Sequence, residues 1–310
     1  MSGSLDLRGI IPPVSTPFTA GGDIAVDDLV RLIEFQLEAG VHGLFVLGST
    51  SETVGLTERQ QELVLATAME TVKGRVPVLA GCIDFTTNRV IDRANRAKAY
   101  GVDGLVVCAP FYVKPDQAEI VRHFQLIKEA VDLPIMAYDI PSAVQTKIQR
   151  PTLRALAEQQ VLNGLKDSSG EESNFRGVLL DNQDLPDFRV FTGSELVVDA
   201  AFMMGAHGCV PGLGNVDPHG YVRLYEAATS GDLPAAIAEQ ERLYRLFAIT
   251  GVGFRPGVGW SASAWGGFKV ALELRGIISC ARPSEPMSPL DEAAYAGIRE
   301  ILVDTGLLEA

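Results

Sequence analysis

Short apolar runs in this sequence end in polar side chains that suit carbonyl chemistry. Lys166 directly follows the run Val161–Leu165. An inward-facing lysine at the end of a strand would have its amine desolvated, and such an amine can attack a ketone carbon. Tyr138 ends another run, and a phenol beside an amine can carry the protons that imine formation requires. Position alone leaves two alternatives open, an exposed Lys166 paired with Asp167 and a Tyr138 that only packs on Pro141.

Two further runs end in segments that could take part in the same chemistry. The turn Gly48–Glu52 contains Ser49 and Thr50, and Ala109–Tyr112 follows another apolar run. The two hydroxyls and the backbone N–H groups of the turn could bind a carboxylate as a small anion nest. Taken alone, the Gly-Ser-Thr turn is weak evidence for such a site.

The elements that position these side chains alternate in type from Gly9 to about Ser230. Short β-branched or apolar runs are followed by longer amphipathic stretches, which is typical of repeated βα units. The predicted strands are Ile10–Ser15, Gly43–Leu47, Val76–Ala80, Gly104–Cys108, Ile135–Tyr138, Leu162–Lys166, Arg189–Thr192 and Gly208–Val210.

The amphipathic stretches between these strands have recognisable helix starts. Thr57 with Gln60 three residues later is a capping-box pattern. The predicted helices are Leu29–Leu37, Leu63–Val72, Arg89–Tyr100, Gln117–Val131, Thr152–Glu158, Ser173–Leu180, Glu195–Met204 and Pro218–Ala228. Strict alternation of eight strands and eight helices predicts an α/β fold of the (β/α)8 TIM barrel type, with an open doubly wound sheet and a long tail as the alternative.

The domain organisation follows from where the alternation stops. We expect residues 1–230 to form the barrel that carries the active site, at the C-terminal ends of its strands. Residues 231–310 contain three more helical stretches, Leu233–Ile249, Ser263–Arg275 and Leu290–Asp304. We expect them to pack on the barrel as appended C-terminal helices, within the same structural unit.

Composition excludes several classes of partner. The 310 residues carry a formal net charge of −13 and no basic run, so nucleic acid is not an expected partner. No apolar stretch approaches the roughly 18 residues of a membrane helix. Met1–Arg8 shows no signal-peptide pattern, which predicts a cytoplasmic protein. The four cysteines and four histidines form no ligand spacing, so we expect buried reduced thiols and no metal or other cofactor.

The segments at the strand ends give more specific evidence of function together than any one of them gives alone. In chain order the sequence contains TPF, GSTSE, PFY, YDIPS, GLKDSSG and TGSE, and it ends in Gly208–Gly212 and the C-terminal helices. This series resembles the family of dihydrodipicolinate synthase and N-acetylneuraminate lyase, and the resemblance covers nearly the whole chain. It implies a class I, metal-independent lyase in which Lys166 forms a Schiff base with pyruvate or another 2-oxo acid.

The resemblance also implies roles for other residues. Tyr138 would be the acid/base, and Tyr112 would cross a subunit interface to complete a proton relay with Thr50 and Tyr138, in a homodimer or homotetramer. The substrate-binding positions would be Ser49 and Thr50 for the pyruvate carboxylate, Gly193 and Val210 for the pocket lining, and Ser168 for the second substrate. Lys147 and Lys269 are the lysines to compare with Lys166, and we expect them to be surface or helix residues.

Four positions depart from the family pattern. Ser51 stands where a Gly is usual, and Asp139 stands where an Asn is common. Ala143 stands where the synthases carry an Arg that binds the carboxylate of aspartate semialdehyde, and Leu196 stands where sialic acid lyases carry a Glu. The last two departures argue against both of these substrates, unless Arg176 or Arg255 replaces the missing cation.

The rim of the predicted site is rich in hydroxyls, which suits a polyhydroxylated chain. We therefore expect the small-molecule partners to be a 2-oxo acid and an aldehyde, released from a 2-keto-3-deoxy sugar acid. The alternatives are a 4-hydroxy-tetrahydrodipicolinate synthase that uses aspartate semialdehyde, a non-catalytic small-molecule-binding barrel, and a metal-dependent barrel enzyme. The rim hydroxyls are Ser142, Ser168, Ser169 and Ser194.

Overall fold

The computed structural model describes residues 7–309, in which strands and helices alternate. The first six residues, which form most of the segment searched for a signal peptide, lie outside the described residues. The strands are β1 Gly9–Ile10, β2 Leu44–Val46, β3 Val78–Gly81, β4 Gly104–Cys108, β5 Ile135–Asp139, β6 Gly164–Asp167, β7 Arg189–Thr192 and β8 Gly208–Cys209.

The helices lie mainly between these strands and after the last of them. They are α1 Val26–Glu38, α2 Glu58–Val72, α3 Thr87–Ala99, α4 Gln117–Ala130, α5 Pro141–Val144, α6 Arg150–Glu158, α7 Glu172–Asp181, α8 Val198–Met203, α9 Pro218–Ser230, α10 Leu233–Phe247, α11 Trp260–Leu274 and α12 Glu292–Asp304. Short 3₁₀ helices are η1 Thr53–Gly55, η2 Gly212–Asn215 and η3 Ala248–Thr250.

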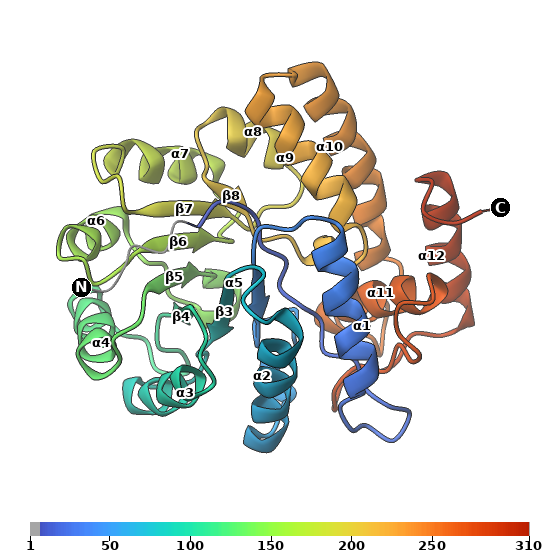
Figure 1. Ribbon diagram of the computed structural model, residues 1–310, viewed down its shortest axis with the longest axis horizontal. Helices are drawn as coiled ribbons and strands as arrows, with labels where there is room; N and C mark the ends of the chain where they lie inside the picture. Colours follow the sequence, from blue (N-terminus) through green and yellow to red (C-terminus); the bar gives the residue numbers. More distant parts are fainter. Residues whose placement is uncertain (1–6, 310) are drawn as a thin grey trace.

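The strands close into a barrel. In the described chain, eight parallel strands pair in the order β1-β8-β7-β6-β5-β4-β3-β2, and Figure 1 labels β3 to β8 of this series. β1 and β2 stand at the two ends of the sheet. The residues that follow β1 join these ends, because Phe45 N donates to Pro12 O at 3.0 Å and Val14 N donates to Phe45 O at 2.8 Å. A parallel bridge between Pro13 and Phe45 completes the closure. The predicted (β/α)8 barrel is confirmed, and the open doubly wound sheet is wrong.

The buried apolar residues form two layers. The inner layer fills the barrel, and the outer layer lies between the strands and the surrounding helices. Side chains alternate along each strand, so a strand residue belongs to one layer or the other. The inner layer consists of Leu7, Ile11, Phe45, Leu79, Ile83, Val106, Cys108, Met136, Tyr138, Val144, Phe191 and Val210.

Two local differences from the predicted elements have physical causes. The strand predicted at Ile10–Ser15 is regular only in its first part, because Pro12 and Pro13 lack the N–H that a ladder needs. The helix predicted to start at Glu195 begins at Val198, since the Glu195 side chain turns inward to accept hydrogen bonds. The short helix α5 was not predicted. The capping box of Thr57 and Gln60 at the start of α2 is confirmed.

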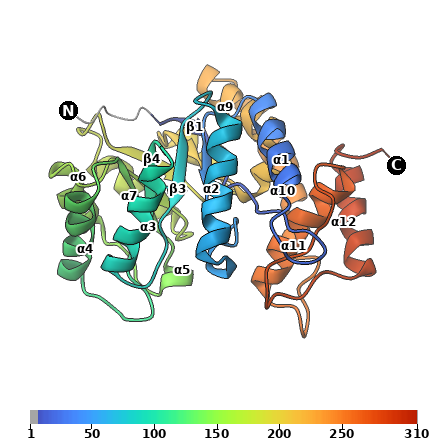
Figure 2. The same cartoon turned by 60° about the horizontal axis from the view of Figure 1, so that its bottom comes forward.

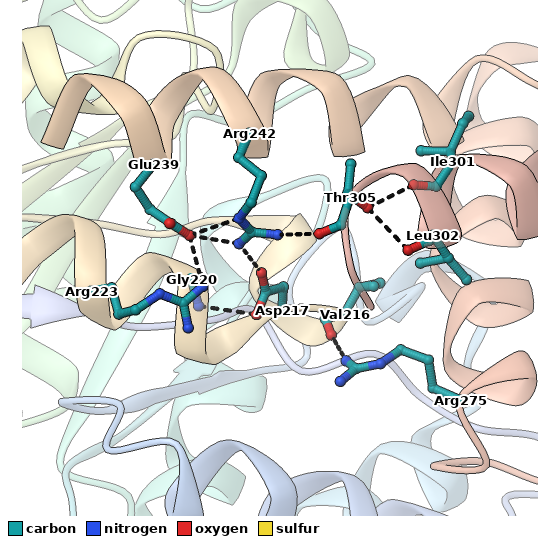
Figure 3. Close-up of polar contacts among 10 residues, drawn as sticks. All are labelled: Val216, Asp217, Gly220, Arg223, Glu239, Arg242, Arg275, Ile301, Leu302 and Thr305. Carbon is teal, nitrogen blue, oxygen red and sulfur yellow. Dashed lines mark hydrogen bonds and ion pairs between the residues drawn. The ribbon is translucent and has the colours of Figure 1, made fainter. Parts of the chain in front are cut away.

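The C-terminal helices lie on one side of the barrel, where α11 is next to α1 (Figure 2). Arg242 of α10 is central to their attachment (Figure 3). Its guanidinium pairs with the buried Asp217 at the start of α9, donates to the carboxylate of Glu239 at 2.6 Å, and donates to Thr305 O at 3.2 Å beyond α12. One side chain thus joins three helical elements. The proposed division at residue 230 stays a prediction.

Candidate active site

The candidate site lies inside the barrel, at the C-terminal ends of β5 and β6. Lys166 is followed by Asp167 within β6, so the strand ends one residue later than predicted and begins at Gly164 rather than at Leu162. Lys166 is paired in register with Tyr138 of β5, and Asp167 with Asp139. Because side chains alternate, Lys166 and Tyr138 face the barrel interior, while the two aspartates face the helices.

The Lys166 amine is enclosed by aromatic rings. Its Nζ lies 4.1 Å from the centroid of the Tyr138 ring and 5.2 Å from that of Phe45. The residue is only 4% exposed, and within residues 7–309 its amine makes no ion pair. The alternative pair with Asp167 is wrong, since that carboxylate faces the other layer and accepts Ser169 N at 2.8 Å. A buried amine without a carboxylate partner suits attack on a carbonyl carbon.

The two comparison lysines have different surroundings. Lys147 Nζ lies 2.6 Å from the Asp139 carboxylate, which also accepts Ile148 N at 3.1 Å. Burial raises the pKa of Asp139 above its ordinary value, although Lys147 opposes this shift. Lys269 pairs with Glu52, and it is buried within α11 rather than on the surface. Both amines are therefore already engaged with carboxylates.

The turn after β2 presents Ser49 and Thr50. It is held by backbone bonds from Glu52 N to Ser49 O at 3.0 Å and from Thr53 N to Gly48 O at 3.3 Å. Within the described chain, the backbone N–H groups of Ser49 and Thr50 make no hydrogen bond, which leaves them free for an anion.

Ser51, the departure from the usual Gly, has a structural role in this turn. Its buried hydroxyl donates to Val14 O at 2.5 Å and accepts Gly48 N at 3.1 Å. The side chain therefore ties the turn to the segment after β1. The residues flanking the turn, Leu47 and Glu52, both have a φ of 58°, a left-handed conformation that non-glycine residues rarely adopt.

The structure brings Ser168 and Gly193 against Lys166. A Cβ placed on Gly193 would lie 2.0 Å from Ser168 Oγ and 3.2 Å from Lys166 Cε, so a side chain at this position would require Ser168 and Lys166 to shift. Val210 belongs to the inner layer with Tyr138, and its N–H donates to Thr192 O at 2.9 Å. These three predicted binding residues thus surround the mouth of the barrel near the amine.

Tyr112 is placed away from the other predicted catalytic residues. It is 94% exposed, has a φ of 73°, and contacts the ring of Phe85 at 6.2 Å between centroids. Within the described residues of one chain it makes no ring contact or hydrogen bond with Thr50 or Tyr138. Its neighbours on this face include the exposed apolar side chains Phe85 and Val113.

The residues expected to select the second substrate are mostly exposed to solvent. Ala143 is exposed on α5, and Leu196 is 40% exposed. Arg255 pairs with Asp291 at 2.7 Å, so it is already engaged. The rim offers fewer free hydroxyls than predicted. Ser169 Oγ is buried, and Ser194 Oγ donates to Glu172 at 3.3 Å.

Glu195, which follows β7, was missed as a site residue. Its carboxylate accepts Leu213 N at 2.7 Å and Tyr221 OH at 3.1 Å, and so holds the loop after β8. Burial raises the pKa of Glu195 to about 7, and the Lys166 charge opposes that shift. A carboxylate directly after a strand end, in the TGSE segment, was the available signal.

The remaining sequence predictions concern metal sites, membrane helices and the cysteines. In the described residues no cluster of His, Cys, Asp or Glu has the geometry of a metal site, and no helix is long and apolar enough to cross a membrane. All four cysteines are free, and Cys82, Cys108 and Cys209 are buried as predicted, whereas Cys280 is only half-buried. Burial raises the pKa of Cys82 and of Cys108 to about 12, which keeps them as thiols.

The barrel fold and the position of the candidate site define the class of this protein. It is the class of (β/α)8-barrel enzymes, whose active sites lie at the C-terminal ends of the strands. The sequence pattern of the Dihydrodipicolinate synthetase family matches residues 6–304, and the chain belongs to this family. It is therefore an enzyme of a family of lyases and synthases.

Similar proteins support this assignment. An uncharacterized DapA-like lyase of Halobacterium salinarum is 34% identical over 98% of this chain and 96% of its own. A 4-hydroxy-tetrahydrodipicolinate synthase of Phenylobacterium zucineum is 31% identical over 97% of this chain and 98% of its own. The structure of YagE from E. coli, a member of the dihydrodipicolinic acid synthase family in complex with pyruvate, has a TM-score of 0.91 and 29% identity, over 97% and 99% of the two chains.

The raised pKa of the half-buried Glu195 generates a pH-dependent prediction. Its pKa is raised to about 7 in the folded protein, so its contribution to stability is full below about pH 4.5 and is lost as the pH rises through 7. Glu195→Gln keeps an acceptor for Leu213 N but cannot titrate. The unfolding free energy of the native protein, relative to this variant, should fall by on the order of 1–3 kcal/mol from pH 4.5 to 7.

Urea unfolding of both proteins at several pH values measures this difference, and the variant serves as the matched control for all other titrating groups. A difference in unfolding free energy that stays constant between pH 4.5 and 7 would contradict the raised pKa of Glu195.

Proposed function

We propose that this enzyme is a Schiff-base lyase in which Lys166 condenses with pyruvate or a related 2-oxo acid. The observation that carries the proposal is the Lys166 amine itself, which is 4% exposed, faces the barrel interior and lies 4.1 Å from the Tyr138 ring centroid. Lys147 and Lys269 are both paired with carboxylates. The pyruvate complex of YagE is consistent with a 2-oxo acid as the common substrate.

The proposed reaction needs only groups that this chain supplies. The amine attacks the ketone carbon, and loss of water from the carbinolamine gives an imine. In the cleavage direction, the hydroxyl on the fourth carbon gives its proton to Tyr138, which has given up its own proton during dehydration of the carbinolamine. The protonated imine accepts the electron pair of the breaking bond between the third and fourth carbons, and the aldehyde leaves. The enamine then takes up a proton, and hydrolysis of the imine releases pyruvate and the free amine. The imine is the electron sink, so this proposal invokes no metal or cofactor.

The neighbouring residues have complementary roles in this proposal. Ser49 and Thr50 bind the 2-oxo acid carboxylate through the free N–H groups of their turn. Tyr138 moves the protons of imine formation, since its ring lies against the amine. Gly193 and Val210 line the 2-oxo acid pocket, and Ser168 contacts the aldehyde portion.

We propose that Tyr112 acts in the site of a neighbouring subunit, in a homodimer or homotetramer. In a single chain, the Tyr112 side chain is 94% exposed and its backbone has a φ of 73°, which is a strained conformation for a tyrosine. Phe85 and Val113 beside it are exposed as well, and a second copy that covers this face would bury all three. The hydroxyl of Tyr112 would then reach Thr50 and Tyr138 of the partner.

For the second substrate we propose the aldehyde portion of a 2-keto-3-deoxy sugar acid. Ala143 supplies no cation for the carboxylate of aspartate semialdehyde, and Arg255 is engaged by Asp291. Ser142 and Ser168 remain at least partly exposed, which suits a hydroxylated chain. The synthase reaction is the competing function, because relatives of 31% identity carry that name.

The lysine assignment predicts selective covalent labelling. Borohydride in the presence of pyruvate should add one stable adduct to the protein, on Lys166, as measured by intact mass and peptide mapping. Lys166→Ala should fold normally and show no adduct, because a residue at the barrel mouth contributes little to the core. Lys147→Ala is the matched control and should keep the adduct. An adduct mapped to Lys147 or Lys269 would show that the assignment is wrong.

The subunit assignment predicts complementation. Tyr112→Phe and Lys166→Ala should each be inactive or slow, by about 10² to 10⁴-fold for the loss of a proton-transfer group. Hybrid oligomers formed from the two variants should regain part of the activity, since one site then has both the lysine and a partner's tyrosine. Subunit exchange is verified with differently tagged chains. No recovery despite demonstrated exchange would contradict an intersubunit Tyr112.

The substrate assignment predicts an order of specificity constants. A charge-assisted carboxylate contact contributes about 1.5–3 kcal/mol, so its absence at Ala143 should cost on the order of 10-fold to 10²-fold in kcat/KM for aspartate semialdehyde. The measurement compares kcat/KM for 2-keto-3-deoxygluconate and related acids with that for aspartate semialdehyde plus pyruvate. Faster turnover of aspartate semialdehyde would overturn the substrate proposal and leave the Lys166 chemistry intact.

A further inference from the structure

An ion pair lies inside the protein behind the turn that carries Ser49 and Thr50. Glu52 is 0% exposed and Lys269 of α11 is 1% exposed, and their charged groups are in contact. Neither residue opens into the mouth of the barrel, so neither can touch a substrate. Because two buried charges are costly to desolvate, their position should have a reason beyond stability.

The pair joins segments that are far apart in the sequence. The second oxygen of the Glu52 carboxylate accepts Ser284 N at 2.6 Å. Lys269 Nζ donates to Arg282 O at 2.9 Å and lies 4.2 Å from the centroid of the Phe18 ring. The turn after β2 is thus fixed to α11 and to the segment that follows it, both from the C-terminal part of the chain.

The backbone at Glu52 depends on this anchorage. Its φ of 58° is the left-handed conformation, which is strained for a residue other than glycine. Glu52 N donates to Ser49 O, so the same residue that bears the carboxylate also closes the turn. The contact surface is tight, because a Cβ on Gly55 of η1 would lie 2.5 Å from Ser284 Oγ. The turn therefore has little room to move while the pair is intact.

We propose that Glu52 and Lys269 are positioning residues, which hold the Ser49–Thr50 turn in the geometry that binds the carboxylate of the 2-oxo acid. The C-terminal helices are then part of the binding site, although none of their side chains touches the substrate. This inference rests on the proposed function, in which that turn binds the carboxylate.

Breaking the ion pair of Glu52 and Lys269 should have two separate effects. Removal of one partner leaves the other charge buried and unpaired, which lowers stability. Relaxation of the turn moves the N–H groups of Ser49 and Thr50, and a shift of about 1 Å in a binding group can cost about 10²-fold. Only the second effect changes how tightly pyruvate binds before the lysine reacts.

The test measures borohydride trapping of Lys166 at increasing pyruvate concentrations, which gives a half-saturating concentration and a maximal trapping rate. The variants are Glu52→Gln, Lys269→Met and the double variant, with unfolding midpoints measured in parallel. Arg242→Met is the matched control, because it cuts another buried link between the barrel and the C-terminal helices, away from the turn.

Both single variants should raise the half-saturating pyruvate concentration about 10- to 100-fold, while the maximal trapping rate changes little. The control should lower the unfolding midpoint and leave half-saturation unchanged. The double variant, which has no unpaired charge, should recover stability but not pyruvate affinity. If Lys269→Met does not fold, the isosteric Glu52→Gln carries the same comparison.

Half-saturation that changes no more in Glu52→Gln than in the control would overturn the positioning role. The same holds if the double variant recovers affinity together with stability. In both cases the native enzyme still labels at Lys166, so the proposed function survives. No trapping of the native enzyme at any pyruvate concentration would instead overturn the proposed function, and this inference with it.

Discussion

Side-chain alternation along β6 places the Lys166 amine inside the barrel, while both aspartates of the adjoining strand ends face the helices. The rings of Tyr138 and Phe45 are the aromatic neighbours of the amine at this level of the interior. This exclusion of carboxylates separates Lys166 from Lys147 and Lys269, which are both paired. The reactivity proposed for Lys166 depends on that separation, because an amine held in an ion pair is a poor nucleophile.

The rest of the site is arranged around that amine by backbone constraints. Gly193 leaves room for Lys166 Cε and Ser168 Oγ, both of which would have to shift to accommodate a side chain there. The turn of Ser49 and Thr50 is flanked by left-handed residues and leaves its N–H groups free. Strained backbone of this kind persists only where the surroundings hold it, and here the C-terminal helices do so. The helices after the barrel thus have a direct structural link to the mouth.

Much of this arrangement follows from local sequence. Alternation of short runs and amphipathic stretches predicts the barrel, and the residue after each run predicts which side chains reach its mouth. The pair of Glu52 and Lys269 could not be predicted in this way, because it joins segments that meet only after the barrel has closed. A lysine in the almost wholly apolar α11 was the one signal for it. The role proposed for Tyr112 similarly depends on a second chain, and the choice of aldehyde depends on rim geometry that no local pattern encodes.

The central claim is that an unpaired lysine and a carboxylate-binding turn meet at one site. A crystal structure of the enzyme soaked with pyruvate tests it most directly. We predict continuous density from Lys166 Nζ to the ketone carbon, with the carboxylate bound by the N–H groups of Ser49 and Thr50. Pyruvate bound without a covalent link to Lys166, or held by a carboxylate contact elsewhere in the barrel, would contradict the account.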